Sequence, residues 1–189
     1  MTGGNQFPIG LASLQAEAAK GAKLPPVESW NPKNCGDIDI TIARDGTWHH
    51  LGTPIGRPEL VRLFSSVLRR EADGFYLVTP AEKLRIVVED APFLAVLLDV
   101  EGKGQEQKLI FTTNAGDSVT ADAAHPIRVE MDAQTREPAP YLLVRARLEA
   151  RIARPVFYRL ADMAVDAPDA PGMLGVWSSG KFFPIGPKA

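Results

Sequence analysis

The chain has 189 residues, enough for one domain or two small ones whose core needs no disulfide or metal to be stable. Apolar residues make up 45% and charged residues 23%, as in an ordinary globular protein. The net charge of −2 excludes electrostatic attraction of the whole molecule to nucleic acid or to an anionic membrane. No apolar run approaches the roughly 20 residues that span a bilayer. The N-terminus lacks a signal-peptide pattern and Cys35 is the one cysteine, so we expect a cytoplasmic protein without disulfides.

The composition along the chain divides it into three parts. Residues 1–36 are expected to form an N-terminal helix or arm and a linker, with a short helix over Leu11–Lys20. The following "KLPPVESWNPKNCG" is rich in Pro and Asn, which is typical of an extended linker, and Trp30 is expected to dock it onto the body. Residues 37–91 and 92–189 are expected to form an N-terminal and a C-terminal α+β domain.

The N-terminal domain begins with the pattern of a hairpin. Ile38, Ile40 and Ile42 alternate with polar residues, and the pair Asp45-Gly46 suits a tight turn. "RPELVRLFSSVLRREADG" then predicts a helix that begins at Pro58 and ends at Gly74.

Strands dominate the rest of the chain. "FLAVLLDV", residues 93–100, is apolar on both faces and is expected at the centre of a sheet. "YLLVRARLEARI", residues 141–152, predicts one long strand with Arg145, Arg147 and Arg151 on one face. A second helix follows from Pro155, and the chain closes as a hairpin that turns at Ser178–Gly180.

Two nine-residue strings resemble each other, "IGRPELVRL" at 55–63 and "IARPVFYRL" at 152–160, with five identical positions. One interpretation is a pair of structurally related halves; the other is two unrelated strand-to-helix junctions that share good helix-start chemistry. In each string an arginine precedes the proline, and a guanidinium beside helix N–H groups is suited to an anion.

Longer strings resemble one family. "RDGTWHHLGTPIGRPELVRLFSSVLRREADGFYLVTPAEKLRIVVEDAPF", "YLLVRARLEARIARPVFYRLADMAV" and "GVWSSGKFFPIG" are similar to the bacterial domain-of-unknown-function family 1285 (DUF1285). The resemblance implies an α+β fold of two β-rich domains related by duplication, each with antiparallel strands and one packed helix, the C-terminal one superficially like a pleckstrin-homology domain. It also implies a site for a small, nucleotide-like molecule near the contact between the halves, and a role in signal transduction. It supplies no catalytic residue.

Other chemistries find little support in the residues. The three histidines have no metal-ligand spacing, and neither a serine-nucleophile elbow nor a phosphate-binding glycine loop is present, so we expect no metal and no cofactor. The carboxylates Glu82, Glu89 and Asp90, with His49, leave open a hydrolase. A protein–protein adaptor is a third alternative.

The sequence thus favours a non-enzymatic module that binds an anionic, nucleotide-like small molecule where the two domains meet, with no nucleic-acid or membrane partner. The arginines and tryptophans at the junctions and on the long strand are the residues expected to form the ligand wall: Trp48, Arg57, Arg145, Arg154 and Trp177.

Overall fold

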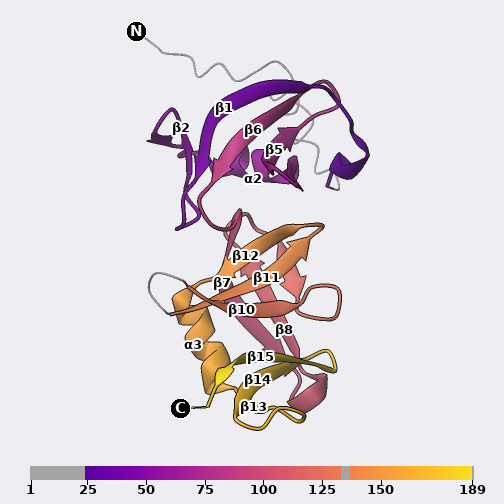
Figure 1. Ribbon diagram of the computed structural model, residues 1–189, viewed down its shortest axis with the longest axis vertical. Helices are drawn as coiled ribbons and strands as arrows, with labels where there is room; N and C mark the ends of the chain where they lie inside the picture. Colours follow the sequence, from indigo (N-terminus) through magenta and orange to yellow (C-terminus); the bar gives the residue numbers. More distant parts are fainter. Residues whose placement is uncertain (1–23, 133–136, 189) are drawn as a thin grey trace. The chain divides into compact units, whose positions relative to one another are not determined.

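The structure is a computed structural model that describes residues 24–132 and 137–188. The helix expected over Leu11–Lys20 lies outside the described residues. The chain divides into two compact units, Met1–Glu89 and Asp90–Ala189, and each is described by itself (Figure 1).

A six-stranded sheet with one helix forms the N-terminal unit. Its strand order is β3-β2-β1-β6-β5-β4, in which β1 and β6 are parallel and all other neighbours are antiparallel. The elements in chain order are η1 (Val27–Ser29), β1 (Asn34–Ile42), β2 (Trp48–His50), β3 (Thr53–Pro54), α2 (Pro58–Ser66), β4 (Leu68–Glu71), β5 (Gly74–Val78) and β6 (Lys83–Val88).

A second six-stranded sheet, a helix and a three-stranded sheet form the C-terminal unit. The larger sheet has the order β10-β11-β12-β7-β8-β9, with β12 and β7 parallel, and the smaller has the order β13-β14-β15. The elements are β7 (Phe93–Glu101), η2 (Gly104–Glu106), β8 (Lys108–Thr113), β9 (Ser118–Thr120), β10 (Ile127–Met131), β11 (Pro138–Arg145), β12 (Leu148–Ile152), α3 (Arg154–Asp162), β13 (Val165–Asp166), β14 (Met173–Ser178) and β15 (Lys181–Pro187).

The two larger sheets have the same topology. Each consists of two three-stranded antiparallel meanders, and the first strand of one meander lies parallel to the last strand of the other. The helices, however, occupy different places in this order, because α2 joins the two meanders whereas α3 follows the second. The similar strings at 55–63 and 152–160 therefore mark non-equivalent helices, and the relationship between the halves lies in the strand order.

Each unit has its own hydrophobic core. In the N-terminal unit α2 buries Phe64 against Trp48 of β2, with a ring-centroid distance of 6.2 Å. In the C-terminal unit α3 buries Val156 and Leu160, and the Arg159 guanidinium donates to the Leu98 carbonyl of β7 at 2.7 Å. Strand β7 is central in the sheet, as the apolar run at 93–100 predicts, although Val96 and Leu97 on this strand are exposed. The α+β, two-domain prediction is thus confirmed, while the likeness to a pleckstrin-homology domain stays a prediction.

The prediction of a helix that continues to Gly74 is wrong, because α2 ends at Ser66. The chain turns there and returns as β4, which pairs with β5 over Leu68–Glu71. Ser65 and Ser66 donate their hydroxyls to the carbonyls of Arg62 and Leu63, at 2.8 and 2.7 Å, and such local bonds compete with helix continuation. Pairing in the sheet then decides the conformation of the residues that follow.

The long strand expected over residues 141–152 is a hairpin. Strands β11 and β12 pair as antiparallel neighbours around a turn at Ala146 and Arg147, and Ala146 has a φ of 45°. Apolar and polar residues continue to alternate across this turn, so the sequence pattern does not show where β11 ends and β12 begins. Arg145 ends one strand and Arg151 lies on the next, and the expected ladder on one continuous strand does not exist.

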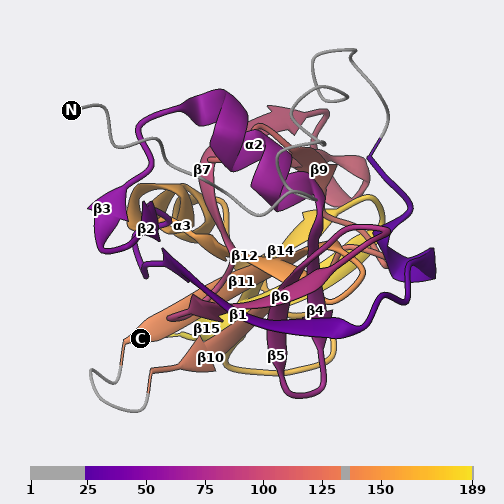
Figure 2. The same ribbon diagram turned by 90° about the horizontal axis from the view of Figure 1, so that it is seen from above.

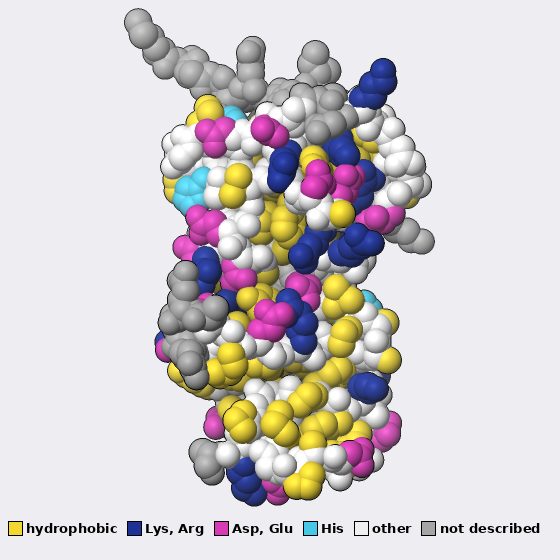
Figure 3. All heavy atoms as spheres, in the orientation of Figure 1, with side chains coloured by type: hydrophobic (Ala, Val, Ile, Leu, Met, Phe, Trp, Pro, Cys, Tyr) yellow, Lys and Arg dark blue, Asp and Glu magenta, His cyan; other side chains and the backbone are white. Residues whose placement is uncertain are grey.

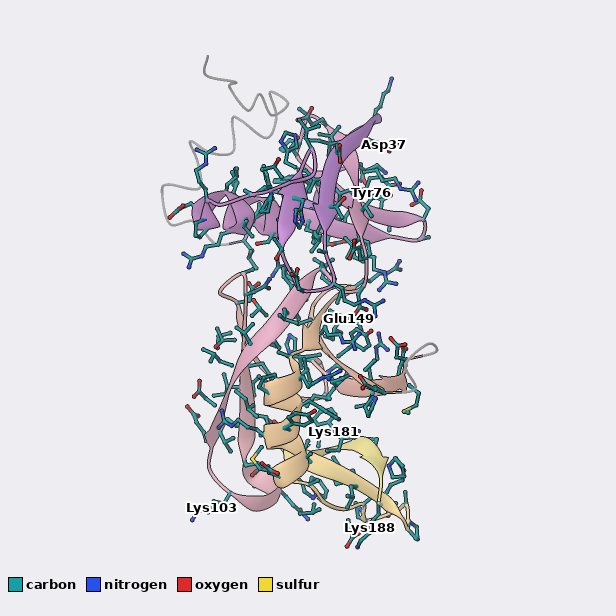
Figure 4. The ribbon with its side chains drawn as sticks, turned by 90° about the vertical axis from the view of Figure 1, so that its left-hand side faces the viewer. Asp37, Tyr76, Lys103, Glu149, Lys181 and Lys188 are labelled. Carbon is teal, nitrogen blue, oxygen red and sulfur yellow. The ribbon has the colours of Figure 1, made fainter. Side chains whose placement is uncertain are left out.

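The segment before β1 is fixed onto the N-terminal unit, as the position of Trp30 predicts. Trp30 packs against a small cluster of Val27, Tyr76 and Val78. The buried guanidinium of Arg69 on β4 donates to the Val27 carbonyl at 3.0 Å and to the Trp30 carbonyl at 2.7 Å. Figure 4 marks Tyr76 in the N-terminal unit.

Candidate functional site

A pocket of about 250 Å³ opens in the N-terminal unit beside the start of α2. It is lined by the turn between β2 and β3, by β3, by the link to α2 and by the first turn of that helix, and Figure 2 shows these segments next to one another. The lining residues are His50, Leu51, residues 53–57 and Leu60.

The walls of this pocket are held by backbone hydrogen bonds. The Ile55 amide donates to the Trp48 carbonyl at 2.7 Å, and the Leu51 amide donates to the Asp39 carbonyl at 3.1 Å. These bonds tie the link and the turn to β2 and β1. The pocket is thus part of the sheet framework rather than a gap under a loose loop.

Arg57 is the cationic residue of the link and the N-cap of α2. Its side chain is exposed, and it forms no ion pair with any residue that the structure describes. The helix itself adds little, because Pro58 has no N–H and the Leu60 amide donates to the Arg57 carbonyl at 3.1 Å. Within the described part of the chain, the Glu59 amide is the first-turn N–H that remains for a ligand.

The turn at Leu51 has an unusual residue for its geometry. His50 and Thr53 pair across a two-residue turn, in which Leu51 has a φ of 50° and Gly52 a φ of 72°. Turns of this type favour Asn, Asp or Gly at the first position, because a bulky side chain is strained at positive φ. Leu51 is nevertheless 67% exposed at the rim of the pocket.

Trp48 does not line this pocket. It is 2% exposed and its ring packs on Phe64, so its place is in the core of the N-terminal unit. Trp48 is therefore a core residue and not a wall of this pocket.

The three remaining residues expected at the site lie in the C-terminal unit and have different surroundings. Arg145 pairs with Asp117 at 3.0 Å and lies over the Phe93 ring at 4.8 Å. Arg154 is the first residue of α3 and pairs with Glu137 at 2.5 Å on the exposed surface. Trp177 packs edge-on against Phe182, with ring centroids 5.3 Å apart. A common site of these three with Arg57 stays a prediction.

A network of charged residues surrounds Tyr141 in the C-terminal unit. Asp90 accepts hydrogen bonds from the Tyr141 hydroxyl at 2.7 Å and from Arg151 at 2.6 Å. Glu149 extends from β12 (Figure 4) and accepts two hydrogen bonds from Arg128, at 2.6 and 2.8 Å, while Arg128 lies 4.3 Å over the Tyr141 ring.

The ion pairs of this network explain why its arginines are poorly suited to form a ligand wall. Burial and the hydrogen bond to Asp90 raise the pKa of Tyr141 above its ordinary value. The hydrogen bonds from Arg128 to Glu149 raise the pKa of Arg128. Arg128 and Arg151 are thus neutralised by carboxylates of the same unit, which leaves them little free charge for a ligand.

The pocket was not foreseen from the sequence, because residues 47–51 were expected to form the whole second strand of the first hairpin. The signal was the dipeptide Leu51-Gly52 between "WHH" and "TPI", since a glycine in a two-residue connection indicates a tight hairpin. Strand β3, only two residues long, is too short to show a period.

Neither a metal centre nor a membrane helix is found in the described residues. In that part of the chain no three His, Cys, Asp or Glu side chains gather where they could hold a metal ion. The helices there are too short and too polar to cross a bilayer. Figure 3 shows cationic and anionic side chains intermixed over the face that it presents.

Family comparisons agree along nearly the whole chain. Residues 25–91 match the model described as "Domain of unknown function (DUF1285), N-terminal domain", and residues 92–185 match "Protein of unknown function (DUF1285), C-terminal domain". The chain belongs to the DUF1285 family. The resemblance inferred from the sequence strings is thereby confirmed.

Two solved structures are similar to this DUF1285 chain. The crystal structure of a DUF1285 family protein from Silicibacter pomeroyi DSS-3 is 54% identical over 92% of this chain and 94% of that chain, with a TM-score of 0.83. A DUF1285 family protein from Shewanella baltica OS155 is 25% identical over 66% of this chain and 91% of that chain, with a TM-score of 0.51. No curated protein matches the chain.

Proposed function

We propose that this DUF1285 protein is a non-enzymatic module that binds a small anionic molecule in the pocket beside α2. Through this binding it takes part in signal transduction as a sensor of that molecule. The observation that carries the proposal is Arg57, a cation at a preformed hollow with no carboxylate partner among the described residues.

The contrast with three arginines of the C-terminal unit supports this choice of site. Arg145, Arg151 and Arg154 each form an ion pair with a carboxylate of their own unit. A ligand that bound any of them would first have to displace that carboxylate. Among the described residues, Arg57 has no carboxylate that an anion would have to displace, and a guanidinium can hold a carboxylate or phosphate through two parallel hydrogen bonds.

The hydrolase alternative has weaker support. Glu89 accepts a hydrogen bond from the Arg44 amide at 3.0 Å, and Asp90 is engaged by Tyr141 and Arg151. Both carboxylates thus have structural partners, and neither lines the pocket. A general base also needs a nearby substrate site, so we favour binding without turnover.

The proposal is tested by thermal unfolding and calorimetric titration with small carboxylates, phosphates and nucleotides. Binding of at least one class should raise the unfolding temperature of the wild type, and Arg57→Ala should weaken it at least tenfold. Arg62→Ala, an exposed arginine on the same helix that does not line the pocket, is the matched control and should bind as the wild type does.

Two outcomes would overturn the proposal. The first is the absence of binding across the whole panel. The second is binding that Arg57→Ala and Arg62→Ala leave equally intact, which would place the site elsewhere. Turnover of a phosphate or carboxylate ester that is lost in Asp90→Asn or Glu89→Gln would favour the hydrolase.

A further inference from the structure

We infer that the molecule held in this pocket is a short aliphatic anion, an unbranched chain that ends in a carboxylate or phosphate, rather than a nucleotide. This inference rests on the proposed function and specifies the ligand class of the same site. It follows from the size of the pocket, from the nature of its walls and from the residue at its rim.

The size of the pocket limits how much of a ligand can be buried in it, because the hollow is partly open to solvent. A volume of about 250 Å³ corresponds to roughly eight water-sized groups at about 30 Å³ each. After a carboxylate is placed at Arg57, space remains for a chain of roughly five carbons. A nucleoside monophosphate, with its base, sugar and phosphate, is far larger and could insert only one end.

The apolar part of the walls is aliphatic. Leu51, Pro54, Ile55 and Leu60 line the hollow beside the polar His50 and Thr53, and the imidazole of His50 is the one aromatic ring among the lining residues. Sites for nucleobases use aromatic rings on which a base stacks. Trp48, the nearest tryptophan in sequence, is committed to the core against Phe64. An alkyl chain therefore suits these aliphatic walls better than a base, for which His50 offers one small ring.

Leu51 supplies an observation that is independent of the cavity. Its positive φ of 50° is strained, and its side chain is 67% exposed to water, so neither turn geometry nor core packing explains a leucine here. Asparagine or aspartate would tolerate both the positive φ and the exposure to water better than leucine does. An apolar contact with a ligand at the rim of the pocket accounts for a leucine at this position.

The charges complete the match with an amphipathic anion. Arg57 lies at the end of the link and Leu51 at the turn, and both border the same hollow. The site therefore presents one cationic end and one aliphatic rim. A molecule with a single anionic head and an unbranched apolar tail satisfies both, whereas inorganic phosphate satisfies only the first.

The experiment is a calorimetric titration of the full chain at pH 7 with acetate, butanoate, pentanoate, hexanoate, octanoate, neutral hexanol, inorganic phosphate and adenosine monophosphate. Affinity should rise about fourfold per added methylene up to roughly five carbons in the chain and then level off. Hexanol should bind at least tenfold more weakly than hexanoate. A comparison of butyl phosphate with pentanoate shows whether the pocket prefers a phosphate or a carboxylate head group.

Leu51→Asn is the decisive variant, because the residue that improves the turn removes the apolar rim. We expect hexanoate to bind at least fivefold more weakly, acetate to be unaffected, and the unfolding temperature to stay the same or rise. A fall in unfolding temperature, with equal losses for all ligands, would show a purely structural role for Leu51 and overturn the inference.

The outcomes also separate this inference from the proposed function. If phosphate or adenosine monophosphate binds in an Arg57-dependent manner and chain length has no effect, the aliphatic ligand class is wrong and the anion site stands. If no anion binds at all, both are wrong.

Discussion

Arginine side chains in this protein owe their roles to their immediate partners. Arg69 is buried, and its guanidinium fixes the segment before β1 and also contacts Glu71, which in turn accepts a hydrogen bond from Lys83 at 2.8 Å. Arg57, by contrast, is exposed at a pocket. The same chemical group thus acts as a structural cross-link in one place and is available to a ligand in another.

Glu71 provides a prediction at the residue scale. The hydrogen bond from Lys83, together with Arg69, lowers the pKa of Glu71 below its ordinary value, against the opposing effect of burial. A carboxylate whose folded-state pKa is lowered stabilises the fold at pH above its unfolded pKa, and this contribution is lost as the pH falls through the folded-state value.

Glu71→Gln should therefore lower the free energy of unfolding by about 1 kcal/mol at pH 7. Below pH of about 4 the difference from the wild type should shrink toward zero, because the wild-type carboxyl becomes protonated as well. Urea unfolding at several pH values measures this, with exposed Glu101→Gln as the control. A difference that stays constant down to pH 3 would contradict the assignment.

At the scale of elements, the hairpin of β14 and β15 illustrates how packing fixes a local structure. Ser178 is fully buried at its end, where it accepts from the Leu109 amide at 3.0 Å and donates to the Ala121 carbonyl at 2.6 Å. These bonds attach the hairpin to the larger sheet through β8. In the hairpin itself, the Phe182 ring lies directly against Gly175.

Gly175→Ala should destabilise the protein by about 2 to 3 kcal/mol. A Cβ at this position would lie 2.4 Å from the Phe183 carbonyl oxygen and 2.4 Å from the Phe182 ring, and the backbone oxygen cannot move without disturbing the pairing. Gly186→Ala on the neighbouring strand meets nothing within 4 Å and should change the stability by less than about 1 kcal/mol. Equal losses in the two variants would refute the steric explanation.

For the whole molecule, the organisation into two units with separate cores predicts how unfolding is distributed. Trp30 and Trp48 report on the N-terminal unit and Trp177 on the C-terminal unit. In a Trp177→Phe background, tryptophan fluorescence therefore follows the N-terminal unit alone, whereas circular dichroism follows both.

Adding Gly175→Ala to Trp177→Phe should lower the urea midpoint seen by circular dichroism and leave the fluorescence midpoint within about 0.2 M of its value. The physical reason is that the added clash lies in the C-terminal unit and each unit buries its own apolar residues. A shift of both midpoints by the same amount would show instead that the two units unfold as one cooperative structure.

Much of this architecture follows from local patterns in the sequence. Alternating isoleucines and the Asp45-Gly46 pair predict the hairpin of β1 and β2, the apolar run at 93–100 predicts a central strand, and Ser179-Gly180 predicts the last turn. These signals work because strand period, burial and turn geometry depend on residues that are neighbours along the chain. The family is also decided at this level, by strings of residues.

Only the tertiary structure decided which charges are satisfied and where a hollow remains. Arg145, Arg151 and Arg154 meet the carboxylates of Asp117, Asp90 and Glu137, up to 61 residues away in the sequence. The sequence by itself determined the hairpin of β1 and β2, the central strand β7, the two-domain organisation and the family, because these depend on local periodicity and composition. The pairing of β1 with β6, the neutralised arginines and the pocket at Arg57 depend on contacts between distant segments, and no local pattern records them.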